Sequence, residues 1–425
     1  QTMDIRAIDE SIGDFDYIIA HGVHSWVPPD VQEAVIRICG RHLSERGVAL
    51  VSYNAYPGCH LRQMIRGMAQ FHVREIEDPV EQVEQLRALV RFLSGSVGDE
   101  QKLYRQILEE ESQRIAKLGD AFLSHDVLEP TNLPIYFHQF VEQAVRHGLQ
   151  YLSEAIPLGP ERSRMAAELR EGLGADCDLI EFEQHLDFLD GTAFRRTLVC
   201  HDSISLSRDL NAAPVEKLVV ASQARPRSPS PDLTTSRPEE FAARKGAMAA
   251  TVRCDSPVGK AALVALADAF PRAMPLDAVV ANAASRLGRS ATGDDHREIR
   301  ALVFGGFEIG AIDLHAWQPE TADGTSSMPE ASPIARYELT YGSEVTNLWH
   351  ERVTLRSSAS RHLLTALDGR RDRDAIVNSM ASALSAEQSV APVGPSPALS
   401  QLCVEIADKL EEAFADLGRA ALLIR

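Results

Sequence analysis

Two short stretches of the chain concentrate side chains that can orient a polar reactant. His21, His24 and Trp26 follow one apolar run, and Asn54 and Tyr56 follow another. Imidazole, amide and phenol groups donate or accept hydrogen bonds, and aromatic faces can hold a cation. These five residues are therefore the first candidates for a reaction site. The alternatives are that the two histidines are structural loop residues bound to backbone and that Trp26 is a packing anchor.

The elements that would position these side chains form a βαβ unit. Residues 17–20 are a short apolar run followed by glycine and proline, as expected for a buried strand. Residues 31–43 repeat apolar side chains at helical spacing, and Gly47 is the predicted C-cap. Residues 48–53 predict a second buried strand. Ligands of such units bind beyond the carboxyl ends of the strands, which is where the five candidate residues lie.

Composition and charge narrow the class of protein. The 425 residues are 44% apolar, which predicts several domains, and no stretch approaches the length of a membrane helix. A net charge of −18 disfavours nucleic acid and weakly favours a basic protein partner. The six cysteines, and the histidines His125, His138 and His147, match no disulfide or metal-ligand spacing. We therefore expect a cytoplasmic protein with reduced thiols, no metal, no membrane insertion and no nucleic-acid partner.

The rest of the chain is predicted to be mostly helical, with polar loops between modules. Apolar stripes at helical spacing recur between residues 60 and 154, and a stretch rich in Pro, Ser and Arg at 223–238 predicts a loop or linker. The predicted domains are 1–60, a helical insertion or dimerisation region at 61–110, 111–222, a linker at 223–256, 257–318 and an α+β domain at 334–425.

The segment 257–318 has the element order of a winged helix. Helices are predicted at 257–270, 276–287 and 294–304, followed by an extended stretch at 307–314. Asp294 and Asp295 precede the third helix, so protein interaction is favoured over DNA binding. Further on, the predictions are a strand at 344–355, a helix at 360–367, a flexible loop at 384–397 and a helix at 398–417.

Several stretches resemble a known family, in the order that the family uses. FDYIIAHGVHSWVP at 15–28 resembles the fourth strand and following loop of class I methyltransferases, and NAYPG at 54–58 resembles the loop after the next strand in methyltransferases that carry a regulatory domain. Three further stretches resemble that regulatory domain itself: HDVLE at 125–129, PIYFH at 134–138 and HGLQYL at 147–152. The family includes lysine methyltransferases of bacterial outer-membrane proteins.

The resemblance implies an α/β plus α fold. This fold comprises a partial class I, Rossmann-like methyltransferase sheet, a helical regulatory region and C-terminal winged-helix-like α+β modules. S-adenosylmethionine is the implied cofactor, and the implied substrate is a protein, with a lysine side chain as methyl acceptor. Asp4 and Ile5 are the pair expected beside the adenine. Ala20, His21 and Gly22 would face the methionine end, and the five residues introduced first would line the acceptor space.

The family pattern is incomplete on the N-terminal side. A first strand, a glycine-rich loop and an acidic residue for the ribose cannot be placed before Phe15. The expectation is therefore an N-terminally truncated methyltransferase, or a degenerate relative that binds cofactor poorly. The alternatives are a noncatalytic regulatory or substrate-docking protein and a winged-helix transcription regulator. A homodimer remains an option.

Overall fold

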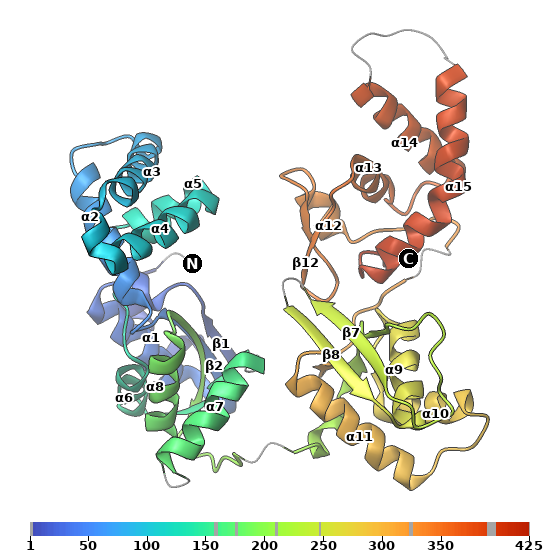
Figure 1. Cartoon of the computed structure of the whole chain (residues 1–425), viewed down its shortest axis with the longest axis horizontal. Helices are drawn as coiled ribbons and strands as arrows, with labels where there is room; N and C mark the ends of the chain where they lie inside the picture. Colours follow the sequence, from blue (N-terminus) through green and yellow to red (C-terminus); the bar gives the residue numbers. More distant parts are fainter. Residues whose placement is uncertain are drawn as a thin grey trace. The chain divides into compact units, whose positions relative to one another are not determined.

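The computed structural model divides the chain into two compact units, Gln1–Asp209 and Leu210–Arg425 (Figure 1). It describes residues 3–156, 160–174, 177–208, 211–245, 248–322, 326–388 and 397–424. The first unit combines a mixed sheet with helices, and the second combines small sheets with helical layers. The predicted combination of α/β and helical regions is confirmed.

The sheet of the first unit has the strand order β1-β2-β4-β3. Its strands are β1 (Phe15–Ala20), β2 (Leu43–Asn54), β3 (Leu149–Glu154) and β4 (Phe194–His201). β1 and β2 are parallel, whereas β4 runs antiparallel to both of its neighbours. The helix α1 (Pro29–His42) connects the two parallel strands, so the predicted βαβ unit is present.

The boundary between α1 and β2 differs from the prediction. Gly47 was expected to cap the helix, but α1 ends at His42 and Gly47 lies within β2. A Cβ at Gly47 would come within 3.0 Å of the carbonyl oxygen of Phe15. The glycine is therefore required for the close approach of two strands, and its sequence signal was assigned to the wrong element.

One face of this sheet carries the core of the first unit. Ala49, Val51 and Tyr53 alternate along β2 and are all buried, as expected when one strand face is covered. They pack against α1 and against α6 (Phe137–Val145), with α8 (Leu179–Asp190) beside α6. The order of these layers can be followed in Figure 1. The carboxyl ends of β1 and β2 are thus held on a well-packed base.

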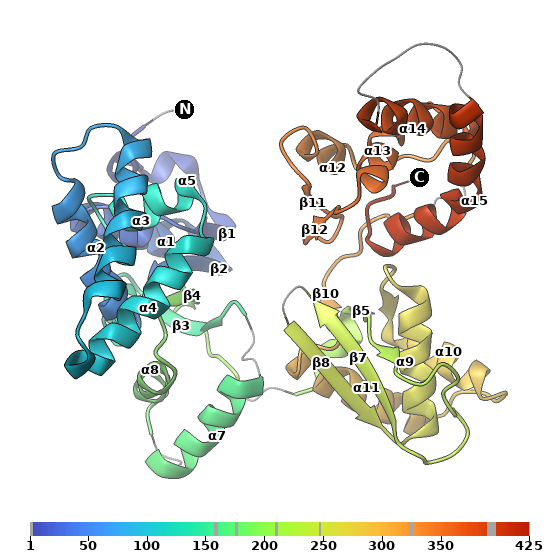
Figure 2. The same ribbon diagram turned by 45° about the horizontal axis from the view of Figure 1, so that its top comes forward.

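A helical layer adjoins this base. It consists of α2 (Cys59–Val73), α3 (Pro79–Ser96), α4 (Lys102–Lys117), α5 (Asp120–Leu123) and a π-helical turn, η5 (Ser124–Leu128). Figure 2 shows α3 and α4 side by side. Their apolar stripes meet in one cluster around Ile65, Leu86 and Leu108. A further helix, α7 (Pro160–Leu173), packs on α8.

The segment predicted as a linker, 223–256, is instead structured where it is described. It contains β6 (Arg225–Pro226), β7 (Glu239–Lys245) and β8 (Met248–Cys254), which form an antiparallel sheet. Phe241 and Val252 face each other across the hairpin and enter the core of the second unit. The loop predicted at 223–238 is present from residue 227 to 238. The linker assignment was wrong for β7 and β8, because a few apolar residues on one face are enough when a core covers them.

The three helices predicted after this segment are present as α9 (Pro257–Ala269), α10 (Leu276–Arg286) and α11 (Gly293–Glu308). The extended stretch expected at 307–314 forms a strand only at β10 (Asp313–His315), because α11 continues to Glu308. β10 pairs with β5 (Val219–Ala221), and β5 pairs with β9 (Met274–Pro275). The strand partner therefore comes from upstream, rather than from a following hairpin.

The last part of the second unit has its own core. It contains α12 (Pro333–Glu338), the hairpin β11 (Glu344–Thr346) and β12 (Arg352–Thr354), α13 (Ser358–Ala366), α14 (Arg373–Gln388) and α15 (Pro397–Arg419). The strand predicted at 344–355 is thus a hairpin. The loop predicted at 384–397 overlaps the end of α14, and residues 389–396 of it lie outside the described residues.

Candidate functional site

The loops after β1 and β2 are joined by two serine hydroxyls. The amide of Gly22 donates to Ser52 Oγ over 2.8 Å, and the amide of Asn54 donates to Ser25 Oγ over the same distance. Gly22 has φ of 68°, a conformation that suits glycine and ends β1 sharply. The two predicted loops therefore meet, as expected for parallel neighbours.

Asn54 and Trp26 both contact the segment that follows the helical layer. Asn54 Nδ2 donates to Asn132 Oδ1 over 3.0 Å, and the carbonyl of Asn54 accepts from the amide of Ile135. Trp26 stacks on His125 of η5, with ring centroids 4.5 Å apart. Two of the predicted acceptor-site residues therefore depend on residues 125–135 for their positions.

Tyr56 belongs to a row of stacked rings. Its ring lies 4.1 Å from that of His60 and 5.3 Å from that of Tyr136, centroid to centroid. His60 Nε2 and the Tyr136 hydroxyl are 3.0 Å apart. Partial burial raises the pKa of the Tyr56 phenol, so it remains a neutral hydrogen-bonding group. This row gives the loop after β2 an aromatic surface beside Asn54.

His24 does not line this space. Its side chain is fully buried between the rings of Tyr53 and Phe140, and Nε2 lies 3.3 Å from Gln143 Oε1. Burial lowers the pKa of His24 to about 4, so the imidazole is neutral at pH 7. The structure gives His24 a packing role in place of the predicted contact with an acceptor.

The residues predicted to face the cofactor are only partly suited to it. Ala20, His21 and Gly22 end β1 at the same edge as Asn54, and His21 and Gly22 are exposed. Their position fits a bound group at this edge. Ile5 begins the short helix η1 (Ile5–Ala7), which Asp4 caps.

Asp4 does not offer a free carboxylate for an adenine. Both of its oxygens accept from the Arg6 guanidinium, which also reaches Asp30 at 2.7 Å. The hydrogen bonds from Arg6 lower the pKa of Asp4 to about 2. A contact between Asp4 and an exocyclic amine would compete with this ion pair.

A small cavity beside Asn54 contains a carboxylate that the sequence did not single out. The cavity has a volume of about 30 Å³. It is lined by Asn54, Cys59, Arg62, Gln63, Ile65, Arg66, Arg114, Asp126, Val127 and Asn132. Burial raises the pKa of Asp126, although His125 and the three arginines oppose this shift. In the sequence, the one indication of Asp126 was the HDVLE motif at 125–129. That motif was interpreted as a family resemblance and not as the position of a reactive group.

Helix α2 holds the wall of this cavity through side chains on one face. Arg66 donates to the carbonyls of Val127 and Glu129, and Gln70 also donates to Glu129. Gln63 donates to the carbonyl of Asn132 over 3.2 Å. These donors are three or four residues apart and therefore share a helix face. We call Gln63, Arg66 and Gln70 the α2 latch.

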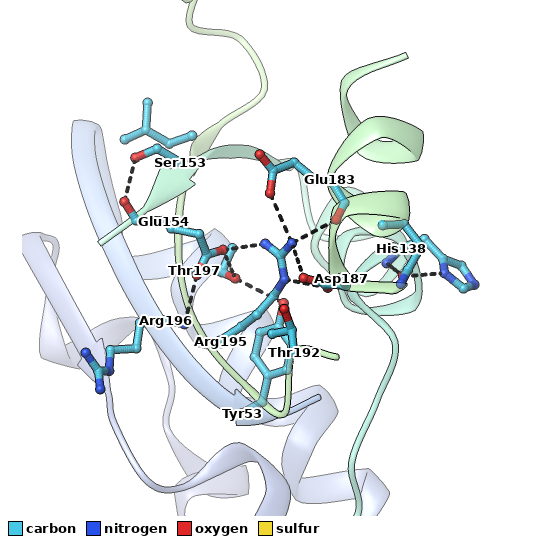
Figure 3. A network of polar contacts seen from close by, with 12 residues as sticks. Tyr53, His138, Ser153, Glu154, Glu183, Asp187, Thr192, Arg195, Arg196 and Thr197 are labelled. Carbon is cyan, nitrogen blue, oxygen red and sulfur yellow. Dashed lines mark hydrogen bonds and ion pairs between the residues drawn. The ribbon is translucent and has the colours of Figure 1, made fainter. Parts of the chain in front are cut away.

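A second charged cluster surrounds Arg195 (Figure 3). Arg195 is buried, and its guanidinium donates to Asp187 over 2.8 and 2.9 Å, to Glu154 over 2.7 Å and to Glu183 over 3.0 Å. It also lies 3.9 Å from the ring centre of Phe137. Burial alone would lower the pKa of Arg195, but the bonds and charge of Asp187 outweigh it and raise the pKa.

No set of three or more His, Cys, Asp or Glu residues placed to hold a metal ion occurs within the described ranges. Among the same residues, no helix has the length and apolar character needed to cross a membrane. All six cysteines lie in described ranges and are free thiols.

Two family models match parts of the chain. Residues 119–201 match a family described as a predicted methyltransferase regulatory domain. Residues 327–422 match a family described as the C-terminal winged helix domain of PKMT. The first range contains His125, Asp126 and Asn132, which border the cavity or support the residues around it.

The similar curated proteins are uncharacterized. Protein RP789 of Rickettsia prowazekii is 29% identical over 384 residues, which span 88% of this chain and 68% of the relative. Protein RP028 of the same organism is 34% identical over 152 residues, which are 36% of this chain and 61% of that protein. These relatives extend the likeness along most of the chain without adding a function.

Solved structures add the link to an enzyme. PKMT2 from Rickettsia typhi matches 100% of this chain and 83% of its own chain, with a TM-score of 0.82 and 26% identity. A second structure of PKMT2, in complex with AdoHcy, matches with the same TM-score and 25% identity. The predicted resemblance is confirmed: the chain contains matches to a methyltransferase regulatory domain and to a PKMT-type winged helix domain, and its fold is similar to that of PKMT2.

Proposed function

We propose that the protein transfers a methyl group from S-adenosylmethionine to a lysine side chain of a protein, and that this chain supplies the acceptor side of the site. The observation that carries the proposal is the joined edge of β1 and β2, where Asn54 and Tyr56 stand beside the exposed residues His21 and Gly22. The likeness to PKMT2, whose structure was solved with AdoHcy, supports the choice of cofactor.

The chemistry requires little from the protein beyond placement. S-adenosylmethionine, when bound, supplies a methyl group attached to a positively charged sulfur. The side chains of this protein hold the acceptor amine in line with that methyl group, keep the amine neutral and exclude water. Asn54 can accept a hydrogen bond from the amine, and the aromatic row at Tyr56 can contact the lysine stem or a cationic centre.

Methyl transfer by the complete protein tests this proposal directly. The protein from the reading frame that contains residues 1–425 would be incubated with S-adenosylmethionine carrying a labelled methyl group and a bacterial outer-membrane fraction. We expect label in methyl-lysine after digestion. We also expect Asn54→Ala to lower the rate by about 10–100-fold, because misplacement of the acceptor costs rate steeply. Gln82→Ala, in α3, is the matched control and should retain the wild-type rate.

Absence of a response to S-adenosylmethionine would contradict the enzyme assignment. If titration with S-adenosylmethionine gives neither heat nor a shift in melting temperature, the protein is better described as a noncatalytic docking or regulatory protein. A binding measurement should therefore precede any mutational study.

We further propose that the protein is a cytoplasmic homodimer without a nucleic-acid partner. Support for dimerisation comes from large apolar side chains exposed on the helical layer, among them Phe71, Val80, Phe92 and Leu103. Extensive exposed apolar surface often marks a protein–protein interface. Light scattering during size exclusion should give a dimer mass, and Phe71→Glu with Phe92→Glu should give a monomer. Free thiols on all six cysteines support a reducing compartment.

A further inference from the structure

The cavity at Asp126 is lined by groups that could bind a ligand, and the chemistry proposed above gives this cavity no role. It joins Asn54, at the end of β2, to Asp126 in the π-helical turn. We propose that this cavity receives the amine of the acceptor lysine, and that Asp126 and Asn54 are the groups that contact it. The proposal rests on the proposed function, because it names the amine site of that reaction.

The size of the cavity selects the ligand. A volume of about 30 Å³ accommodates a group of the size of one or two water molecules. An amine or ammonium head falls within that size, whereas a phosphate, with four oxygen atoms around its centre, exceeds it. A carboxylate is the remaining small candidate, and the hydrogen-bonding groups that are available in the lining must decide between the two.

The lining offers acceptors in the right place for an amine. Within the described residues, the Asp126 carboxylate has no hydrogen bond or ion pair. Asn54 uses its side-chain nitrogen Nδ2 on Asn132, which leaves its side-chain oxygen Oδ1 available. A lysine amine has donors only when charged, and donors with one lone pair when neutral, so both acceptors suit it.

The arginines nearby have other partners or face solvent. Arg66 directs its guanidinium to backbone carbonyls, and Arg114 donates twice to Glu111. Arg62 is exposed on the first turn of α2. The charged groups that act on Asp126 are these three arginines and His125, and Cys59 is the remaining titratable group in the lining.

This arrangement favours the form of the amine that reacts. Methyl transfer needs a neutral amine with a free lone pair, and nearby cations lower the pKa of a lysine. Asp126 acts in the opposite direction, because a carboxylate stabilises the ammonium and orients it on entry. The cavity therefore binds the amine through Asp126 and limits its protonation through the surrounding guanidinium groups.

The proposed step balances as a simple substitution. The neutral amine donates its lone pair to the methyl carbon, the carbon–sulfur bond breaks, and its electron pair remains on sulfur as a thioether. The methylated nitrogen then carries one proton more than a neutral amine. That proton passes to Asp126 or to water, and loss of it prepares the amine for release or for another transfer.

The first test compares two substitutions that should shift the pH dependence in opposite directions. With Nα-acetyl-lysine methylamide as acceptor, the rate should rise with pH as the amine loses its proton. Asp126→Asn removes a negative charge, so this rise should move to lower pH while kcat falls about 10–100-fold through lost orientation. Arg62→Gln removes a positive charge, so the rise should move to higher pH by about half a unit.

The control variants lie outside the cavity. Asp14→Asn and Arg91→Gln change the same charges on exposed residues outside the cavity and should leave the pH profile in place. If neither cavity variant moves the profile, and Arg62→Gln only raises KM, the cavity binds a carboxylate of the substrate and the proposal is wrong.

A second test does not depend on methyl transfer. n-Butylamine, which represents a lysine side chain, would be titrated against the full chain by saturation-transfer NMR, with acetate as the anionic comparison. We expect n-butylamine to bind, and binding to be lost in Asp126→Asn and kept in Asp14→Asn. Binding of acetate alone would overturn the proposal. If n-butylamine binds at Asp126 while no substrate is methylated, the proposed function fails and the amine site stands.

Discussion

Two charged clusters of the first unit differ in how completely their groups are paired. At Arg195, one buried guanidinium meets three carboxylates and an aromatic ring, and Thr197 and Arg162 complete the set. At Asp126, a half-buried carboxylate lies beside a small cavity that Arg62, Arg66 and Arg114 also line; Arg66 and Arg114 donate to other groups.

This difference separates structure from chemistry. All three nitrogens of the buried Arg195 guanidinium have carboxylate partners, so this group is not available to a ligand. The cluster fixes β4 against α8 and contributes to the uniqueness of the core. Burial of a carboxylate without a partner costs free energy, and a bound substrate can offset this cost. Such groups are typical of binding and catalytic sites. The comparison can be tested by removing groups from each cluster and from the loops between them.

The largest effect is expected from Arg195→Met. This substitution removes the buried cation shared by Asp187, Glu183 and Glu154 and leaves Arg162, 3.1 Å from Asp187, as the remaining partner. The free energy of unfolding should fall by about 3 kcal/mol. Chemical denaturation followed by circular dichroism measures the loss. Arg196→Met is the control, since Arg196 lies next in the strand and contacts only the Phe194 ring at 5.4 Å with its guanidinium; it should cost no more than about 1 kcal/mol.

His24 should make the stability of the first unit depend on pH. Its pKa is about 4 when folded and 6.5 when unfolded, so the unfolded state binds more protons between these values. Stability is therefore complete above pH 6.5 and decreases as pH falls toward 4, by about 3 kcal/mol in total.

Replacement of the imidazole tests this dependence. His24→Phe should flatten the stability curve between pH 6.5 and 4, as measured by urea denaturation at several pH values. His72→Gln, at an exposed position in α2, should retain the wild-type slope. An unchanged slope in His24→Phe would show that other groups cause the dependence.

Gly58 should be intolerant of a side chain, because it lies where the loop after β2 crosses the turn before β4. A Cβ there would come within 2.1 Å of the Gly191 carbonyl oxygen. Gly58→Ala should destabilise by about 1–3 kcal/mol and slow methyl transfer, since Tyr56 shares this loop.

The matched control for this prediction is Gly67, in the helix that follows Gly58 directly. A Cβ at Gly67, within α2, meets no atom within 4 Å. Gly67→Ala should therefore stabilise the protein by about 0.5–1 kcal/mol through helix propensity. Thermal denaturation of both variants measures the contrast, and equal effects would disprove the predicted close approach.

The smallest effect on stability is expected at Asp126. Asp126→Asn removes a charge that burial disfavours and breaks no hydrogen bond recorded within the described residues. The free energy of unfolding should change by no more than about 0.5 kcal/mol. A loss comparable to that of Arg195→Met would mean that Asp126 is a structural residue, and the contrast between the two clusters would be lost.

The sequence predicted those features that depend on neighbouring residues. The βαβ unit was predictable because its apolar runs and helical stripe are local signals, and the meeting of the two loops follows from parallel strands. The Arg195 cluster could not be predicted from the sequence, because Glu154, Glu183 and Asp187 are far from Phe137 along the chain. Only the packing of α6, α8 and β4 brings them together.

The candidate site was predicted in part for the same reason. Asn54, Tyr56 and Trp26 follow strands directly and could be identified by position. Asp126 lies in a π-helical turn held by the α2 latch, and no spacing rule reports such a turn. The burial of His24 depends on Phe140, which lies in a helix more than 100 residues away, so its loop position alone was misleading.

The exposed side of β1 has a consequence for assembly. β1 pairs with β2 along one edge, and no strand pairs with its other edge within the described residues. Phe15, Tyr17 and Ile19 are exposed on one face of this strand, with Tyr17 at 77%. Such an edge is a template for a further strand, and any polypeptide that adds one would end beside Gly22. A strand added at this edge would therefore border His21 and Gly22, which follow β1 directly.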